Sequence, residues 1–136
     1  MPILESMQRK FTKRLCGLEK LSYNNRLILC NLPSLELRRL YADLVLCFKI
    51  VHCKVDLTFS DFFQFDSNIH NTRGNCLKLK LVKSNSKYKI HFFSNRVCPI
   101  WNSLTNKIAT SPSVEIFKTF IQEVDFIQFL QHPITL

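Results

Sequence analysis

Apolar residues recur at helical intervals along most of the chain. The first segment, residues 3–15, has apolar side chains on one arc and basic side chains on the opposite arc. The apolar arc comprises Leu4, Met7, Phe11, Leu15 and Leu18. Spacings of three and four residues predict an amphipathic helix. Ser22 and Ser34 precede two further helical segments. Because a serine hydroxyl can accept a hydrogen bond from the first turn of a helix, we predict both as N-caps.

The segment that follows Ser34, residues 35–55, has the longest helical pattern and is expected to lie at the centre of the core. The spacing changes at residues 77–92, where apolar side chains alternate with basic ones on both sides of a Ser-Asn-Ser turn. Two alternating segments around a short polar turn predict a β-hairpin with one apolar and one lysine face. Two final helices follow, with Ser94 and Ser113 as their predicted N-caps.

These patterns together predict a mostly α fold with one small β-hairpin, of the α+β class. The 136 residues suffice for one small helical domain, or for a fragment of a larger one. We expect residues 1–125 to form a single helical module and residues 126–136 to form an apolar tail.

Charge is the most informative property of the composition. The chain has 19 Lys and Arg against 10 Asp and Glu, a formal net charge of +9. Such a balance favours a polyanionic partner, with nucleic acid before an anionic membrane surface. The charge is concentrated on the outer arc of the first helix and on the lysine face of the hairpin, and the alternative is a solvated face that only keeps the fold soluble. The candidate phosphate-binding residues are Arg9, Lys10, Lys13, Arg14, Lys78, Lys80 and Lys89.

Tyr88 and His91 lie close enough to the hairpin lysines to stack on a nucleic-acid base. Other classes of function lack their motifs. With only two glycines, the chain has no glycine-rich phosphate loop. We expect neither a membrane span nor a secretory signal, and hence an intracellular protein of the nucleus or cytoplasm. In that compartment the six cysteines are expected to be reduced and mostly buried.

Two short patterns resemble catalytic or metal sites. Tyr41-Ala42-Asp43 is similar to the YADD box of reverse transcriptases, but the second aspartate is a leucine and the triplet lies in a helical segment. We interpret it as a core tyrosine beside a solvated aspartate. Cys47, His52 and Cys53, with Cys76 or His70 as a possible fourth ligand, do not have the two close ligand pairs of a structural zinc site. We therefore expect core thiols and a surface histidine, with no metal, no cofactor and no catalytic residue.

Ten short strings carry a family resemblance through their order and spacing. They are ESMQRKFTKRL, LSYNNRL, LPSLELRRLYADL, FKI, SDFF, TRGN, KLKL, FFSNRV, WNSL and SPSVEIFK. Together they resemble the C-terminal segment of the reverse transcriptases of Jockey-type non-LTR retrotransposons (LINE elements), downstream of the polymerase palm and thumb. The resemblance covers Ile3 to Lys118. Because Met1 directly precedes it, the chain looks like a fragment of an element copy.

The resemblance implies that the parent protein joins an endonuclease to an RNA-directed DNA polymerase, whose catalytic aspartates lie outside the matching segment. It therefore implies a non-catalytic, basic module or remnant that contacts RNA or DNA beside the missing polymerase domain. The alternative is a protein-interaction piece that docks on the polymerase thumb without contacting nucleic acid. Family positions without a defined role fall on Arg38, Arg39, Arg73, Asn95, Arg96 and Trp101.

Overall fold

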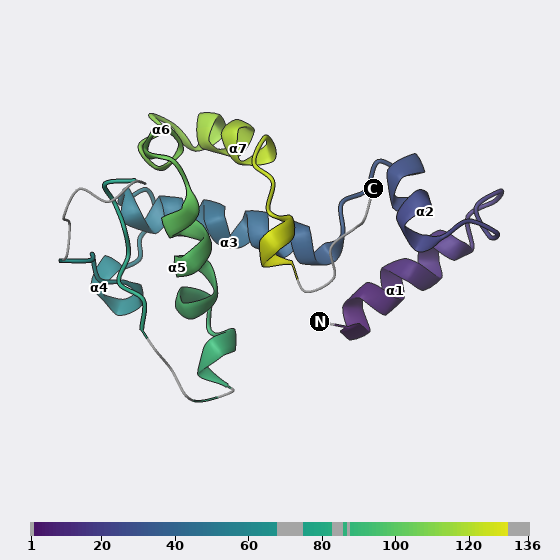
Figure 1. Cartoon of the computed structure of the whole chain (residues 1–136), viewed down its shortest axis with the longest axis horizontal. Helices are drawn as coiled ribbons and strands as arrows, with labels where there is room; N and C mark the ends of the chain where they lie inside the picture. Colours follow the sequence, from purple (N-terminus) through teal and green to yellow (C-terminus); the bar gives the residue numbers. More distant parts are fainter. Residues whose placement is uncertain (1, 68–74, 83–85, 87, 131–136) are drawn as a thin grey trace. The chain divides into compact units, whose positions relative to one another are not determined.

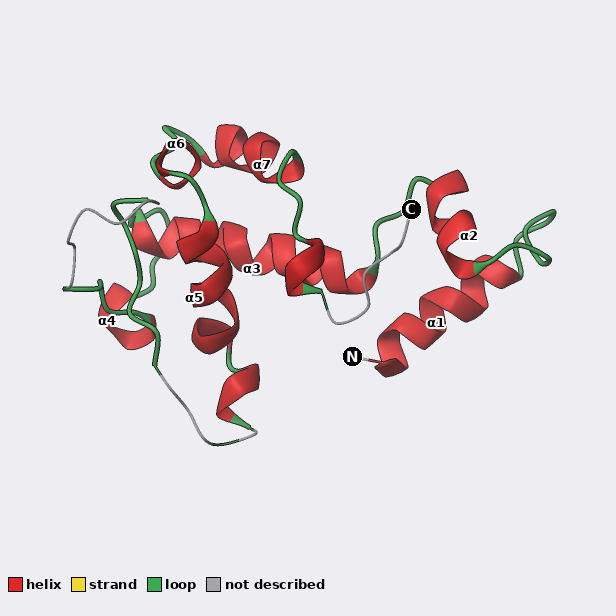
Figure 2. Cartoon of the chain, viewed as in Figure 1, coloured by secondary structure: helices red, strands yellow, loops and turns green. Residues whose placement is uncertain are grey.

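The computed structural model describes residues 2–67, 75–82, 86 and 88–130 (Figure 1). Throughout this part of the chain the regular elements are helices, which confirms the predicted mostly α fold (Figure 2). They are α1 (Pro2–Lys13), α2 (Tyr23–Leu29), α3 (Leu35–Val51), α4 (Phe59–Phe62), the 3-10 helix η1 (Lys89–His91), α5 (Phe93–Ser103), α6 (Asn106–Ala109), α7 (Val114–Gln122) and the 3-10 helix η2 (Ile127–Phe129). Among the described residues, no helix has both the length and the apolar character to cross a membrane.

The helices belong to two compact units. The first unit contains the described residues up to Leu40 and from Asp125, and the second contains those from Tyr41 to Val124. Helix α3 begins in the first unit and continues into the second.

Three of the four predicted serine caps are confirmed. The hydroxyls of Ser22, Ser34 and Ser113 accept hydrogen bonds from backbone N–H groups three residues further on, at 3.2–3.3 Å. The prediction for Ser94 is wrong, because α5 already begins at Phe93. The N-cap of α5 is Phe92, whose side chain has no oxygen to accept a bond.

Helix α3 ends at Val51, four residues before the predicted end. Cys53 has a φ of 51°, in the left-handed region, which breaks the helical path. The Lys54 N–H donates to the Lys49 carbonyl at 2.7 Å, and the Cys53 N–H donates to the Ile50 carbonyl at 3.2 Å. These two bonds form the Schellman motif that closes many helices, here with a cysteine in the position that glycine usually occupies.

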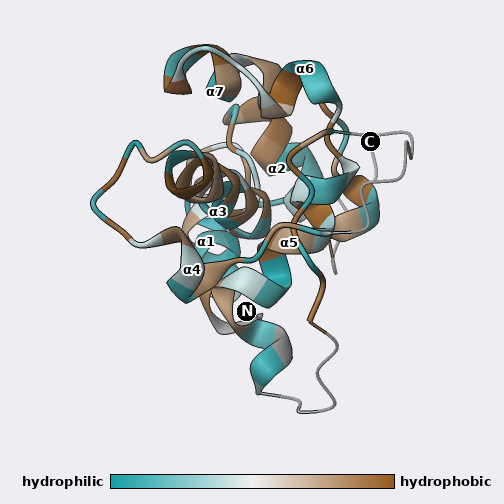
Figure 3. Cartoon of the chain, turned by 90° about the vertical axis from the view of Figure 1, so that its left-hand side faces the viewer, coloured by the Kyte–Doolittle hydropathy of each residue, from teal (hydrophilic) through white to brown (hydrophobic). Residues whose placement is uncertain are grey.

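The core of the second unit lies around α3, whose ribbon is largely hydrophobic in Figure 3. Leu44, Phe48 and Ile50 of α3 are fully buried, as are Trp101 of α5 and Phe117 of α7. The rings of Phe48 and Phe117 stack with centroids 4.3 Å apart, so α3 and α7 are in direct contact. This confirms that the longest apolar pattern in the sequence is central to the core.

The predicted β-hairpin is wrong. Residues 78–80 are extended as expected, but they pair with residues 64–66 by an isolated antiparallel bridge between Phe65 and Leu79. On the other side of the segment, the Asn102 amide bonds both backbone groups of Leu79, accepting from its N–H at 2.8 Å and donating to its carbonyl at 2.7 Å. At Leu79 both edges of the segment are therefore occupied, one by residues 64–66 and the other by the Asn102 side chain.

The second half of the expected hairpin also forms another structure. Tyr88 begins a turn, and η1 then leads directly into α5. Two side chains of α5 bind this turn. The Asn95 amide donates to the Lys89 carbonyl at 2.7 Å, and Arg96 Nη1 donates to the His91 carbonyl at 2.6 Å. Asn95 and Arg96, which the sequence leaves without a role, thus hold η1 at the N-terminus of α5.

Candidate nucleic-acid interface

The four basic residues predicted on the first helix all have exposed side chains. Arg9, Lys10 and Lys13 belong to α1, and Arg14 follows it directly. Up to residue 40 the sequence contains eight Lys and Arg against three Glu, so α1 lies in the more basic part of the chain. Exposed ammonium and guanidinium groups at this density can neutralise several phosphates of one strand.

A polar network fixes α1 against the rest of the first unit. One Glu5 carboxylate oxygen accepts from the Tyr23 hydroxyl at 2.6 Å, and the other accepts from the Leu35 N–H at 3.2 Å. The second contact places a negative charge at the N-terminus of α3, where the helix dipole stabilises it. Burial raises the pKa of Tyr23, and the hydrogen bond to Glu5 raises it further, so the phenol stays protonated and continues to donate.

Arg26 has a structural role in the first unit. Its side chain is buried and donates to the Thr12 hydroxyl at 3.2 Å, to the Leu21 carbonyl at 2.5 Å and to the Arg9 carbonyl at 3.4 Å. These three acceptors replace the hydrogen bonds to water that the guanidinium loses on burial. The guanidinium of Arg9 lies over the Tyr23 ring, 4.8 Å from its centroid, in a cation–π contact that restrains the side chain on the exposed surface.

This network leaves the apolar arc of α1 facing outward. Thr12 is fully buried, whereas Leu4 is 49% exposed and both Met7 and Phe11 are 63% exposed. The first helix is therefore amphipathic as predicted, but it packs through its polar residues. The apolar arc of five residues in the sequence predicts the helix correctly. It does not identify which side of the helix is buried.

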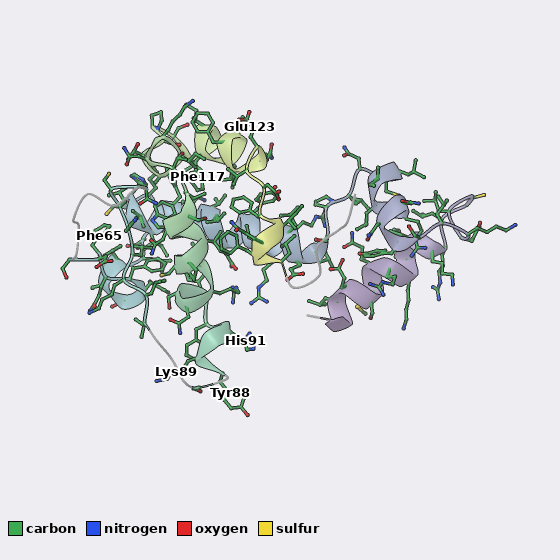
Figure 4. All side chains as sticks on the ribbon, in the orientation of Figure 1. Phe65, Tyr88, Lys89, His91, Phe117 and Glu123 are labelled. Atoms are coloured by element: carbon green, nitrogen blue, oxygen red, sulfur yellow. The ribbon has the colours of Figure 1, made fainter. Side chains whose placement is uncertain are left out.

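The basic residues predicted on the hairpin lie on two different structures. Lys78 is half-buried and Lys80 exposed on the extended segment, whereas Lys89 is exposed on η1. They do not form the single lysine face that was expected, because the hairpin is absent. Tyr88 is 84% exposed and His91 is also exposed, and Figure 4 shows the side chains of Tyr88, Lys89 and His91 extending from the turn in different directions.

The Tyr41-Ala42-Asp43 triplet is part of the structural framework. Tyr41 is half-buried within α3, and burial raises its pKa. The expectation of a solvated aspartate is wrong, because the Asp43 side chain is only 14% exposed and Arg96 pairs with it at 2.7 Å. The Asp43 carboxylate thus pairs α3 with α5.

The Cys and His residues considered as zinc ligands are separated by burial. Cys47 is buried and its pKa is raised, mainly by burial, whereas Cys53 and Cys76 are exposed. His52 is half-buried, its Nε2 lies 2.8 Å from the Ala109 carbonyl, and its ring contacts Phe48. Within the described ranges no three His, Cys, Asp or Glu side chains are grouped as metal ligands would be.

The six cysteines are all unpaired, but the expectation that most are buried is wrong. Cys47 and Cys98 are buried, Cys30 is half-buried, and the other three, Cys16, Cys53 and Cys76, are exposed. Of the remaining residues singled out above, Trp101 is fully buried and its indole N–H donates to the Leu77 carbonyl at 2.8 Å. His70 and Arg73 lie outside the described residues.

Comparison with known proteins gives no relative: no family model, curated protein or solved structure matches the chain.

Proposed function

We propose that this chain is a non-catalytic, basic module that contacts RNA or DNA, in line with its resemblance to the C-terminal segment of Jockey-type reverse transcriptases. The observation that carries the proposal is the group of four exposed basic side chains at and just after α1, Arg9, Lys10, Lys13 and Arg14. Their backbone is fixed by the polar network of Glu5 and Arg26, so binding a phosphate strand would order little more than the side chains themselves.

A salt titration tests this function. The affinity of the full chain for single-stranded RNA and for nicked duplex DNA is measured at several salt concentrations. The test variant carries Lys10→Gln, Lys13→Gln and Arg14→Gln. We expect weaker binding, with the slope of log affinity against log salt flattened by roughly 0.7 per lost contact on single strands and 0.9 on duplex DNA.

A matched variant controls for net charge. Lys20→Gln, Lys54→Gln and Lys118→Gln remove the same charge from exposed positions outside α1. We expect this variant to retain most of the affinity and the slope of the unmodified chain. Equal losses in the two variants would show that only total charge matters, and no binding at low salt would remove the proposal.

A second candidate function, docking on the polymerase domain that the family resemblance implies, is favoured by the outward apolar arc of α1. The exposed side chains of Leu4, Met7 and Phe11 have no cover in the described part of the chain, and exposed apolar patches often mark interaction sites. If this arc is a docking face, the isolated chain should bind a hydrophobic dye or self-associate. Phe11→Glu should reduce this strongly, whereas Ile127→Glu, at an exposed apolar position on η2, should reduce it little.

The two candidates respond differently to salt. Phosphate contacts weaken as salt rises, whereas burial of the apolar arc does not. A chain that binds the dye through Phe11 but does not bind RNA or DNA would support the docking function alone. A monodisperse chain without dye binding would remove the docking candidate.

A further inference from the structure

A groove between α3 and α7 is a second surface of the chain with specific chemistry. It encloses about 430 Å³, within the usual range for small-molecule sites. Most of its lining is apolar, and both helices contribute. The lining residues are Tyr41, Ala42, Val45, Leu46 and Lys49 of α3, and Lys118, Ile121 and Gln122 of α7. All of them belong to the second unit.

The positive charge of the groove is confined to one end. Lys49 directly follows Phe48 and Lys118 directly follows Phe117, and the rings of these two phenylalanines stack 4.3 Å apart. The two lysines therefore lie at the same height along their helices as the stacked phenylalanine rings. Tyr41 lies eight residues before Lys49 on α3, which at 1.5 Å per residue places it about 12 Å away at the other end.

The two lysines have no acidic partner in the described part of the chain. No salt bridge is found for either lysine among the described residues, and the groove lining contains no carboxylate. Two ammonium groups at the mouth of an apolar groove attract an anion, and the low-polarity walls concentrate their field there.

We propose that this groove binds an elongated apolar ligand that ends in a carboxylate. The carboxylate lies between Lys49 and Lys118, and the apolar body extends about 12 Å toward Tyr41. This site lies apart from α1 and does not depend on the proposed nucleic-acid contact. It would remain if that function failed.

The distribution of charge favours this ligand over the alternatives. A nucleic-acid strand carries phosphates at regular intervals, but the groove is cationic at one end only and apolar along the rest. A partner helix is about 10–12 Å across with its side chains, which is wide for a gap between two helices whose core rings stack. An unbranched apolar chain with one anionic end matches the apolar lining and the position of the two lysines.

Decanoate, 1-decanol and decylamine form the test, because they share an apolar chain and differ in the charge of the head group. Binding to the full chain is followed by amide NMR shifts at concentrations that form no micelles. We expect decanoate to shift the amides of the groove saturably, with decanol weaker and decylamine weakest. Lys49→Gln with Lys118→Gln should weaken decanoate about fivefold to tenfold and leave decanol unchanged, as expected for two partly exposed ion pairs.

Two further variants separate the groove from general effects. Lys54→Gln with Lys80→Gln removes the same charge at exposed positions outside the groove and should leave decanoate binding unchanged. Val45→Trp fills the apolar floor and should abolish binding of both decanoate and decanol. Equal affinities for decanoate and decanol, no effect of the Lys49 and Lys118 changes, or shifts on α1 instead of α3 and α7 would each overturn the proposal.

Discussion

Arg96 on α5 bonds a single carboxylate oxygen of Asp43 on α3 through two of its nitrogens, with Nε at 2.8 Å and Nη2 at 2.7 Å from Oδ2. The third nitrogen, Nη1, donates to the His91 carbonyl at the end of η1. One guanidinium thus connects α3, α5 and the turn that carries Tyr88 and Lys89. This partly buried ion pair therefore holds these elements together within the second unit.

Breaking this pair should destabilise the chain measurably. We expect Arg96→Ala to lower the free energy of unfolding by about 2 kcal/mol, because it leaves the poorly exposed Asp43 carboxylate without its charged donor. Asp43→Ala should cost less, since Arg96 is more exposed and keeps the His91 carbonyl. Urea unfolding of both single variants and the double variant measures the coupling. If the two effects simply add, the contact contributes nothing to stability.

Asn102 should be equally important for the extended segment. Asn102→Ala removes both hydrogen bonds to the backbone of Leu79, whose side chain is almost fully buried, and we expect a loss of about 2 kcal/mol. Asn95→Ala on the same helix removes one exposed bond to Lys89 and should cost less than about 1 kcal/mol. Amide hydrogen exchange should show faster exchange at Leu79 in the first variant only. Unchanged protection of the Leu79 amide would show that the Asn102 side chain does not take the place of a neighbouring strand.

The buried thiols predict how stability changes at alkaline pH. Burial raises the pKa of Cys98 from 9.0 to about 11. The unfolded chain therefore loses this proton at lower pH than the folded chain, so the contribution of Cys98 is complete below pH 9 and is lost as pH rises toward 11. Chemical unfolding across this range should show a decline that is reduced in Cys98→Ala. An equal decline in both proteins would assign the effect to other groups, such as Tyr23.

Local features of the fold could be predicted from the sequence because neighbouring residues determine them. The caps at Ser22, Ser34 and Ser113 depend on a hydroxyl and the next three N–H groups. The long apolar pattern of α3 similarly gives a helix that must be buried. The exposed basic side chains at α1 follow from the same periodicity, since they lie on the arc opposite the apolar row.

Features that depend on distant residues could not be predicted. The alternation of apolar and basic residues predicts an extended segment. It does not identify the partners of that segment, which are residues 64–66 and Asn102. The apolar arc of α1 likewise does not reveal that Arg26, 14 residues after Thr12, binds the polar side and leaves Phe11 outside. The same limit applies to Asp43, whose partner Arg96 is 53 residues away.

Tyr88 offers a way to separate base stacking from phosphate binding. Its side chain is 84% exposed beside Lys89, so an unpaired base can stack on the ring without competition from the core. If the second unit contributes to the proposed nucleic-acid contact, Tyr88→Ala should weaken binding of single-stranded RNA by roughly tenfold, because stacking on one aromatic ring is worth about 1–3 kcal/mol per base. Tyr88→Phe retains the ring and should bind nearly as well as the unmodified chain.

Salt and strandedness distinguish this effect from that of the lysines. Tyr88→Ala should not alter the slope of log affinity against log salt, since it removes no charge, whereas Lys89→Gln should flatten the slope. Binding to intact duplex DNA should be unaffected by Tyr88→Ala, because paired bases present no free face to the ring. A loss that is equal on single and double strands, or that Tyr88→Phe shares, would show that the turn around Tyr88 is a structural support and not a stacking surface.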